Sequence, residues 1–186
     1  MVMGSRGPEV FNLDLSRRNL SQVPSEVAWF TSLIELNLEK NVLTEIPGEL
    51  SVLKDLSSLN LSHNRLSKVP KGLCGLPNLI QLNLSHNELV TVPLEVECLV
   101  GLIELDLSHN HLTQLAPELG RLENLAILDL SFNRLTEVPA ELARLENLVR
   151  LDLRGNFLAV SDELLGRTNE PMELLGHILP QEVEGR

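Results

Sequence analysis

The chain has 186 residues, with 15 Lys or Arg against 26 Asp or Glu, so its formal net charge is −11. This charge argues against nucleic acid and anionic membrane surfaces as partners, because both require clustered Lys and Arg. No apolar run approaches the roughly 18–20 residues of a membrane span, so no membrane insertion is expected, and residues 1–10 lack the apolar core of a secretory signal. The only cysteines, Cys74 and Cys98, are too few for a disulfide framework and favour a reducing compartment. We therefore expect a cytoplasmic protein.

The 43 leucines recur with a constant period of 23. Seven units of equal length start at residues 10, 33, 56, 79, 102, 125 and 148. Of the 49 sites at unit positions 1, 4, 6, 11, 14, 18 and 21, 47 hold Leu, Val, Ile or Phe, and the exceptions are Ser161 and Thr168. This period predicts a solenoid in which each unit is stabilised by its neighbours.

Each unit is predicted to begin with a short strand, because the apolar residues at positions 4 and 6 alternate with outward ones. The strands of successive units then form a parallel sheet. Position nine is Asn in every unit except the first, where Arg18 stands. An amide can donate to and accept from backbone groups at a buried turn, so this column is interpreted as structural. Its members are Asn41, Asn64, Asn87, Asn110, Asn133 and Asn156.

The second half of each unit is predicted to be a short helix or 3-10 turn on the convex side. Five units have Pro at position 15 and five have Glu at position 17, and both residue types are favourable in a first helical turn. Cys74 and Cys98 fall on this side in adjacent units. A bridge between them is conceivable, but free, partly buried thiols are favoured.

A solenoid exposes its core at both ends and needs caps. Residues 1–9 form a short N-terminal segment, so Phe11, Trp29 and Phe30 are expected to help cover that end. The repeat domain spans residues 10–165, and residues 166–186 form a C-terminal cap and tail. Apolar spacing predicts an amphipathic helix from about Pro171 to Leu179 over the last unit, with a partner-binding tail as the alternative. The last six residues are expected to fray.

The motif L-x-x-L-x-L-x-x-N-x-L at this period resembles the leucine-rich repeat family over residues 10–165. The resemblance implies an α/β solenoid, a horseshoe of about seven repeats with a parallel concave sheet, short convex helices or 3-10 turns, and a C-terminal helical cap. The segments EIPGEL and EVPAEL also resemble the intracellular Ras-group branch, which includes the Ras-suppressor and Ras–Raf scaffold types. That likeness implies a cytoplasmic signalling adaptor that binds a small GTPase or a phosphatase, but it transfers no functional residue.

Outward positions 3, 5, 7 and 8 are expected to line a concave face roughly 30 Å across, enough for a standard protein interface. The candidate partner-binding residues are Glu35, Asn37, Lys40, His63, Gln81, Asn83, His86, Glu104, Asp106, His109, Ile127, Asp129, Phe132, Arg150, Asp152 and Arg154.

Three histidines, His63, His86 and His109, align at position eight. A metal site needs ligands that converge at about 2.0–2.1 Å, whereas parallel strands direct equivalent side chains the same way, apart or side by side. We interpret the repeated triplet SHN as part of the repeat, and expect no metal or other cofactor.

Phe132 follows the histidines in the same column, and Ile127 is expected nearby on its strand. Exposed aromatic residues are favoured as interface anchors, and Arg150 and Arg154 on the next strand can add charged recognition. The concave face of repeats five to seven is therefore predicted to carry most of the binding energy. The alternative is that Phe132 is a lone apolar surface residue.

The sequence contains no Gly-rich phosphate loop, nucleophile elbow or H-E-x-x-H motif, so no enzymatic activity is predicted. It predicts a non-enzymatic, protein-binding scaffold or adaptor in intracellular signalling. The alternative is a regulatory or recognition fragment of a larger signalling enzyme, namely a GTPase, kinase, phosphatase or ubiquitin ligase.

Overall fold

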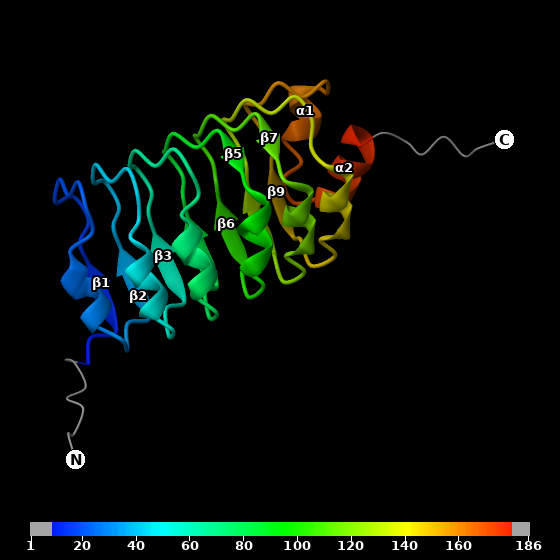
Figure 1. The fold of residues 1–186 in the computed structure, drawn as a ribbon. Helices are drawn as coiled ribbons and strands as arrows, with labels where there is room; N and C mark the ends of the chain where they lie inside the picture. Colours follow the sequence, from blue (N-terminus) through cyan, green and yellow to red (C-terminus); the bar gives the residue numbers. More distant parts are fainter. Residues whose placement is uncertain (1–8, 180–186) are drawn as a thin grey trace, which may run out of the picture.

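One short strand from each 23-residue unit joins a parallel sheet that runs the length of the molecule (Figure 1). The computed structural model describes residues 9–179. The strands pair in register, so that Leu36 lies opposite Leu59 and Leu59 opposite Leu82, each with its side chain in the core. In order across the sheet they are β1 (Asn12–Asp14), β2 (Glu35–Asn37), β3 (Ser58–Asn60), β4 (Gln81–Asn83), β6 (Glu104–Asp106), β8 (Ile127–Asp129) and β9 (Arg150–Asp152).

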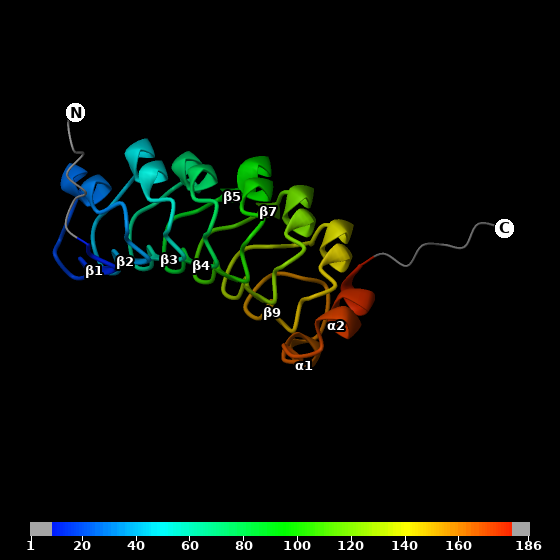
Figure 2. The ribbon, with the colours of Figure 1, turned by 90° about the horizontal axis from the view of Figure 1, so that it is seen from below.

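The return segments form 3-10 helices on the side opposite the sheet (Figure 2). Five of these helices directly follow a Pro, as η2 follows Pro47, and η5 follows Ala116 and begins with Pro117 itself. Pro is favourable at a helix start because the N–H that it lacks would have no partner there. With only five residues, each segment makes one short 3-10 run. They are η1 (Ser25–Trp29), η2 (Gly48–Val52), η3 (Lys71–Gly75), η4 (Leu94–Cys98), η5 (Pro117–Arg121) and η6 (Ala140–Arg144).

Two further segments, β5 (Thr91–Val92) and β7 (Gln114–Leu115), pair in parallel just before η4 and η5. The buried core between the sheet and the 3-10 helices consists of Leu and Val from the periodic columns. The predicted fold class, a leucine-rich repeat solenoid with a parallel sheet and convex 3-10 turns, is confirmed.

The Asn column lies at the buried corner where each strand ends. The Oδ1 atom of Asn87 accepts a hydrogen bond of 3.0 Å from the Leu66 backbone N–H, and its Nδ2 donates to the carbonyl oxygens of Leu61 and Leu84, also at 3.0 Å. Asn64 and Asn110 repeat this pattern in the neighbouring units. Each amide therefore joins one repeat to the preceding one, which is the structural role predicted from the column.

The C-terminal end of the solenoid is covered by α1 (Asp162–Leu165) and α2 (Pro171–Ile178). Leu174 and Leu175 of α2 are buried, so the predicted helix begins at Pro171 as expected and uses its apolar side to pack on the chain. The Leu151 N–H donates to the Thr168 carbonyl oxygen at 2.8 Å, and this bond occupies the outer edge of β9. The six terminal residues expected to fray lie outside the described residues.

Helix α1 was not predicted, because Ser161 interrupts the apolar column at that point. In the structure Ser161 is the N-cap of α1, and its Oγ accepts a hydrogen bond of 3.3 Å from the Leu164 N–H. Ser161, the residue that interrupts the apolar column, therefore also begins the C-terminal cap.

At the N-terminal end, Phe30 packs against the core, but Phe11 is 51% exposed and Trp29 is 67% exposed. The prediction that all three cover this end is therefore wrong for Phe11 and Trp29. Position 2 lies just before the strand and position 20 is the last residue of the 3-10 helix, and in this repeat both are exposed. Most of the predicted N-terminal segment, residues 1–8, lies outside the described residues.

Cys74 of η3 and Cys98 of η4 form a disulfide, with their Cα atoms 5.3 Å apart. The prediction of free thiols is wrong, because positions 19 and 20 of adjacent 3-10 helices face each other across the convex side. The argument for a reducing compartment loses its basis in these residues, since disulfides persist in oxidising environments.

Reduction of this disulfide is expected to lower the free energy of unfolding by about 3 kcal/mol, because it constrains a long loop in the unfolded chain. The bridged residues are 24 positions apart. Urea denaturation with and without dithiothreitol measures the change, and the double variant Cys74→Ser, Cys98→Ser should not respond to the reductant. Two alkylatable thiols in the untreated protein would contradict the bridge.

Candidate functional site

The concave face is formed by the outward side chains of the seven strands and of the turns that follow them. At position five, each Asn or Asp accepts a hydrogen bond through Oδ1 from the backbone N–H two residues later, which ends the strand. Asp129 accepts in this way from Ser131 N at 2.9 Å and also from Ser131 Oγ at 2.6 Å. The same bond is made by Asp14, Asn37, Asn60, Asn83, Asp106 and Asp152.

Asp106 and Asp129 are half-buried, and their carboxylates still contribute negative charge to this face. The position-five residues among the candidates therefore have a structural role that the sequence analysis did not predict.

Position seven does not line the concave face in the four repeats from the third to the sixth. Ser62, Ser85, Ser108 and Ser131 are all buried, because the chain already turns inward toward the Asn column at this point. The expectation that position seven is outward is therefore wrong for these four repeats. Glu39 and Arg154, the larger residues of the same column, remain partly or fully exposed.

Asp152 is 1% exposed, so its side chain is not available at the surface for the partner contact predicted from the sequence. Its two carboxylate oxygens accept hydrogen bonds from Arg154 Nε at 3.0 and 3.1 Å, and this contact raises the pKa of Arg154. The exposed Arg154 guanidinium thus already has a carboxylate partner.

Four rings at position eight form a continuous stack, which we call the ring stack: His63, His86, His109 and Phe132. The ring centroids are 4.0 Å apart for His63 and His86, 4.1 Å for the next pair, and 4.5 Å for His109 and Phe132. Planes within 12° of parallel hold the imidazoles side by side, so their nitrogens do not converge on a point. Among residues 9–179, no group of three or more His, Cys, Asp and Glu could hold a metal ion.

The backbone explains why the rings align. Residues at position eight lie in the left-handed region, with φ of 53° at His63 and Phe132 and 52° at His86 and His109. This conformation turns each side chain out of the strand and in the same direction as its neighbours. The stack ends at Gly155, where φ is +70° and an added Cβ would lie 2.7 Å from Phe132 Cδ1. Phe132 thus covers the space that a side chain at position 155 would fill.

Burial lowers the pKa of His86 below its ordinary value of 6.5, and charge on the flanking His63 and His109 lowers it further. Lys40 acts in the same direction, and Asp106 opposes the shift. Protonation of His86 is therefore less favourable in the folded protein than in the unfolded chain.

We expect the free energy of unfolding to fall as pH is lowered from about 7.5 to 5.5, because the unfolded chain binds a proton at His86 more tightly. The loss begins as pH falls through 6.5, the unperturbed value, and is complete below the lowered pKa of the folded state. Urea denaturation across this range measures it. His86→Asn, which keeps a residue that tolerates the left-handed backbone, should flatten the profile. An unchanged profile in that variant would assign the effect to other groups.

Ile127 and Phe132 differ in their local structure. Ile127 is the first residue of β8 and is half-buried, whereas Phe132 follows the end of the strand and is 53% exposed. Arg150 is the register partner of Ile127 on β9, and the Phe132 N–H donates to the Arg154 carbonyl oxygen at 2.7 Å, so each residue lies beside one of the two arginines predicted for the next strand.

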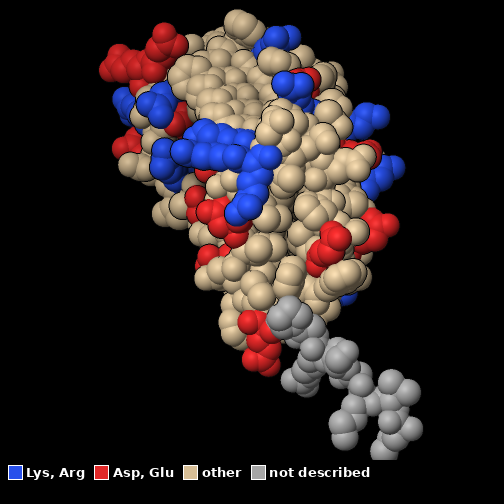
Figure 3. All heavy atoms as spheres, turned by 90° about the vertical axis from the view of Figure 1, so that its left-hand side faces the viewer, with Lys and Arg blue, Asp and Glu red and all other residues tan. Residues whose placement is uncertain are grey.

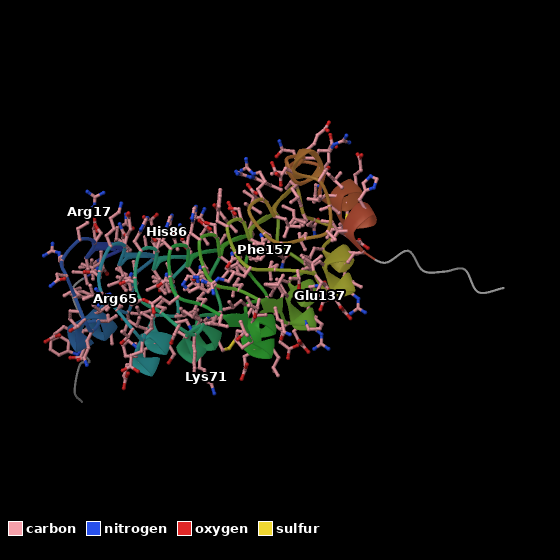
Figure 4. All side chains as sticks on the ribbon, turned by 90° about the horizontal axis from the view of Figure 1, so that it is seen from above. Arg17, Arg65, Lys71, His86, Glu137 and Phe157 are labelled. Carbon is pink, nitrogen blue, oxygen red and sulfur yellow. A yellow bond between two sulfur atoms is a disulfide. The ribbon has the colours of Figure 1, made fainter. Side chains whose placement is uncertain are left out.

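The sheet face itself is acidic. At positions three and five, repeats one to six contain no Lys or Arg, and Glu35, Glu104, Asp106 and Asp129 contribute carboxylates. A hollow of about 190 Å³ lies over β3, β4 and β6, where Gln81 Nε2 donates to Glu104 at 3.1 Å. Arg17 and Lys40 precede the ring stack at position eight. Figure 3, which faces the N-terminal end, shows basic side chains gathered in a band on that end of the molecule. Figure 4 shows Arg17 and His86 along the same edge of the molecule.

A row of exposed apolar residues just before the strands was not singled out from the sequence. It occupies position two, and a period-by-period reading of that column would have found it. Its exposed members are Phe11, Ile34, Ile80, Ile103 and Val149.

Comparison with known proteins places the chain by its repeats. The family model for leucine rich repeats matches residues 8–66, 31–89, 56–112 and 100–158. Among solved structures, a leucine-rich repeat protein of Leptospira interrogans is 36% identical with a TM-score of 0.72, over 79% of this chain and 38% of that chain. The comparison with curated proteins found no match.

Two further structures have the same fold. The ectodomain of the plant membrane receptor kinase GASSHO1/SCHENGEN3 from Arabidopsis thaliana, in complex with CASPARIAN STRIP INTEGRITY FACTOR 2, is 31% identical with a TM-score of 0.71, over 79% of this chain and 18% of that chain. An internalin of Listeria monocytogenes is 23% identical with a TM-score of 0.69, over 81% of this chain and 42% of that chain.

This chain thus spans less than half the length of each solved relative. Within residues 9–179, no helix is long and apolar enough to cross a membrane. The matched segments together run from residue 8 to residue 158, which is most of the chain, and the chain belongs to the leucine-rich repeat family.

Proposed function

We propose that the chain is a non-enzymatic binding module that holds a partner protein on its concave face. The observation that carries the proposal is the ring stack beside the acidic sheet face, where Phe132 is an exposed aromatic residue on a polar surface. Such residues are favoured as interface anchors. The plant receptor ectodomain, which has the same fold, is a structure in complex with another protein factor, and this supports a binding role.

The charge of the face indicates the kind of partner. Because the carboxylates of repeats one to six have no Lys or Arg beside them at positions three and five, a segment with basic side chains complements the sheet. The aromatic edge at Phe132 complements an apolar side chain of the same segment. Arg150 extends the contact to the last repeat.

Several finer assignments stay predictions. They are the scaffold or adaptor role in signalling, the Ras-group branch, a small GTPase or phosphatase as partner, and the cytoplasmic location, whose cysteine argument the disulfide weakens. The alternative, a recognition fragment of a larger signalling enzyme, is consistent with the small share of each solved relative that the chain spans.

Phe132→Ala is expected to weaken partner binding tenfold or more, since anchor residues contribute about 2 kcal/mol or more. Affinity purification with this chain as bait supplies the partner, and titration calorimetry with the purified partner measures the dissociation constant. Phe157→Ala is the matched control, because Phe157 is 68% exposed but lies outside the concave face. Equal affinity of the two variants would show that Phe132 is not an anchor.

A second pair of variants tests the face as a whole. Glu35→Lys with Glu104→Lys reverses charge on the concave side at position three, where side chains do not end the strand. Glu123→Lys with Glu146→Lys makes the same charge change at exposed positions away from the concave face. The proposal requires the first pair to lose the partner and the second to retain it. If both pairs purify the same proteins as the wild type, the concave-face assignment is wrong.

A further inference from the structure

The convex side carries a pocket that is separate from the concave face. It opens between η3 and η4, has a volume of about 160 Å³, and is lined by the apolar side chains of Val69, Leu73, Val96 and Leu99. Pro70 and Pro93 complete its apolar walls. No part of the proposed partner-binding surface enters it.

Glycines in η3 and η5 allow close packing on the two outer sides of the pocket. A Cβ at Gly75 would lie 2.3 Å from Ser51 Cβ, and a Cβ at Gly72 would lie 3.3 Å from Gly48 Cα, so η3 lies very close to η2. A Cβ at Gly120 would lie 2.2 Å from the Glu141 carbonyl oxygen, so η5 lies equally close to η6. Close approach on these outer sides leaves the pocket between η3 and η4.

The disulfide between Cys74 and Cys98 spans this gap and forms part of the pocket wall. Figure 4 shows the bond between the two 3-10 helices, with Lys71 beside it. Because the bridge is covalent, the two walls cannot separate further.

The rim of the pocket is charged. Lys68 and Lys71 line it, and within residues 9–179 neither takes part in an ion pair. Glu95 is the one carboxylate among the lining residues, so the rim carries an excess of one positive charge. Thr91 adds a hydroxyl group that can donate a hydrogen bond.

We propose that this pocket binds a small organic monocarboxylate whose apolar part is a single ring or a short branched chain. An apolar cavity of about 150 Å³ holds a benzene ring, so the apolar part fits the volume between the helices. The carboxylate lies at the rim, where the ammonium groups of Lys68 and Lys71 attract it. Two ligands can thus occupy the protein at once, a protein on the concave face and a small acid on the convex side.

The test uses the oxidised chain of 186 residues and two probes of equal size, 4-fluorobenzoate and the neutral 4-fluorobenzamide. Fluorine NMR titration measures the dissociation constant of each probe. Benzoate should bind more tightly than benzamide. Lys71→Glu, which changes the rim charge by two units, should weaken benzoate binding about fivefold, and Glu95→Gln, which changes it by one unit, should strengthen it about twofold. Neither variant should change benzamide binding. Lys40→Glu, on the other side of the molecule, should change the binding of neither probe.

A steric variant locates the site. Thr91→Trp places an indole at the pocket rim and should abolish binding of both probes, whereas Gln114→Trp is the same change at the register partner on β7 and should leave binding intact. The proposal is wrong if neither probe binds, if the Thr91 variant binds like the wild type, or if benzoate binding does not respond to the two charge variants. Circular dichroism of each variant checks that the fold is retained.

Discussion

Asn87→Ala is expected to lower the free energy of unfolding by about 3 kcal/mol or more, one of the largest effects of any polar substitution in this chain. The variant leaves the Leu66 N–H and the carbonyl oxygens of Leu61 and Leu84 without the amide that pairs them inside the solenoid. Each unpaired buried group costs roughly 1–3 kcal/mol. Urea denaturation followed by circular dichroism measures the loss.

The first repeat provides the matched control. Arg18 occupies the same position nine, but its side chain is exposed and the Asn41 Oδ1 atom accepts from its backbone N–H instead. Arg18→Ala should therefore change the stability by only a few tenths of a kcal/mol, as for other surface substitutions. Similar losses in both variants would mean that the Asn side chains are not the source of the stabilisation.

Gly120→Ala is the second large expected effect. The new Cβ would lie 2.2 Å from the Glu141 carbonyl oxygen and 2.6 Å from its carbonyl carbon, and neither is a flexible side-chain end. The 3-10 helices η5 and η6 must move apart, which should destabilise the protein by about 3 kcal/mol. Thermal unfolding monitored by circular dichroism tests the expectation.

Gly48→Ala is the control for this glycine, because Gly48 begins η2 and an added Cβ there meets nothing within 4 Å. It should be neutral or slightly stabilising, since Ala restricts the unfolded chain more than Gly does. If Gly120→Ala is as stable as Gly48→Ala, the close packing of η5 on η6 is not needed for stability.

Features that repeat in every unit could be predicted from the sequence. The Leu columns form the buried core, and the Asn column pairs backbone groups at the buried corner. Each repeat fills these roles with the same residue type, as at Asn64 and Asn87. Pattern alone therefore predicted the sheet, the 3-10 turns and the helix at Pro171. A parallel stack also implies that equivalent side chains run side by side, which the ring stack confirms.

Features that depend on distances between units could not be predicted. Whether Cys74 and Cys98 bond depends on the distance between η3 and η4, which the repeat pattern does not encode. The burial of Asp152 and of the four serines at position seven depends on how the turns after the strands pack, which the period does not encode. Within the candidate site, the sequence therefore predicted correctly most of the columns that face the concave side. It did not predict which residues of those columns are exposed and unpaired in the structure.

The two ends of the solenoid are closed unequally, and this gives the molecule a direction. At one end α2 buries Leu174 and Leu175, and Thr168 occupies the edge of β9. At the other, Phe11 and Trp29 are exposed, and Arg18 stands where the later repeats have Asn. Because each repeat is stabilised only by its neighbours, local opening should start in the first repeat and advance toward the cap. The C-terminal half of the ring stack, with Phe132, then lies in the part of the molecule that opens last.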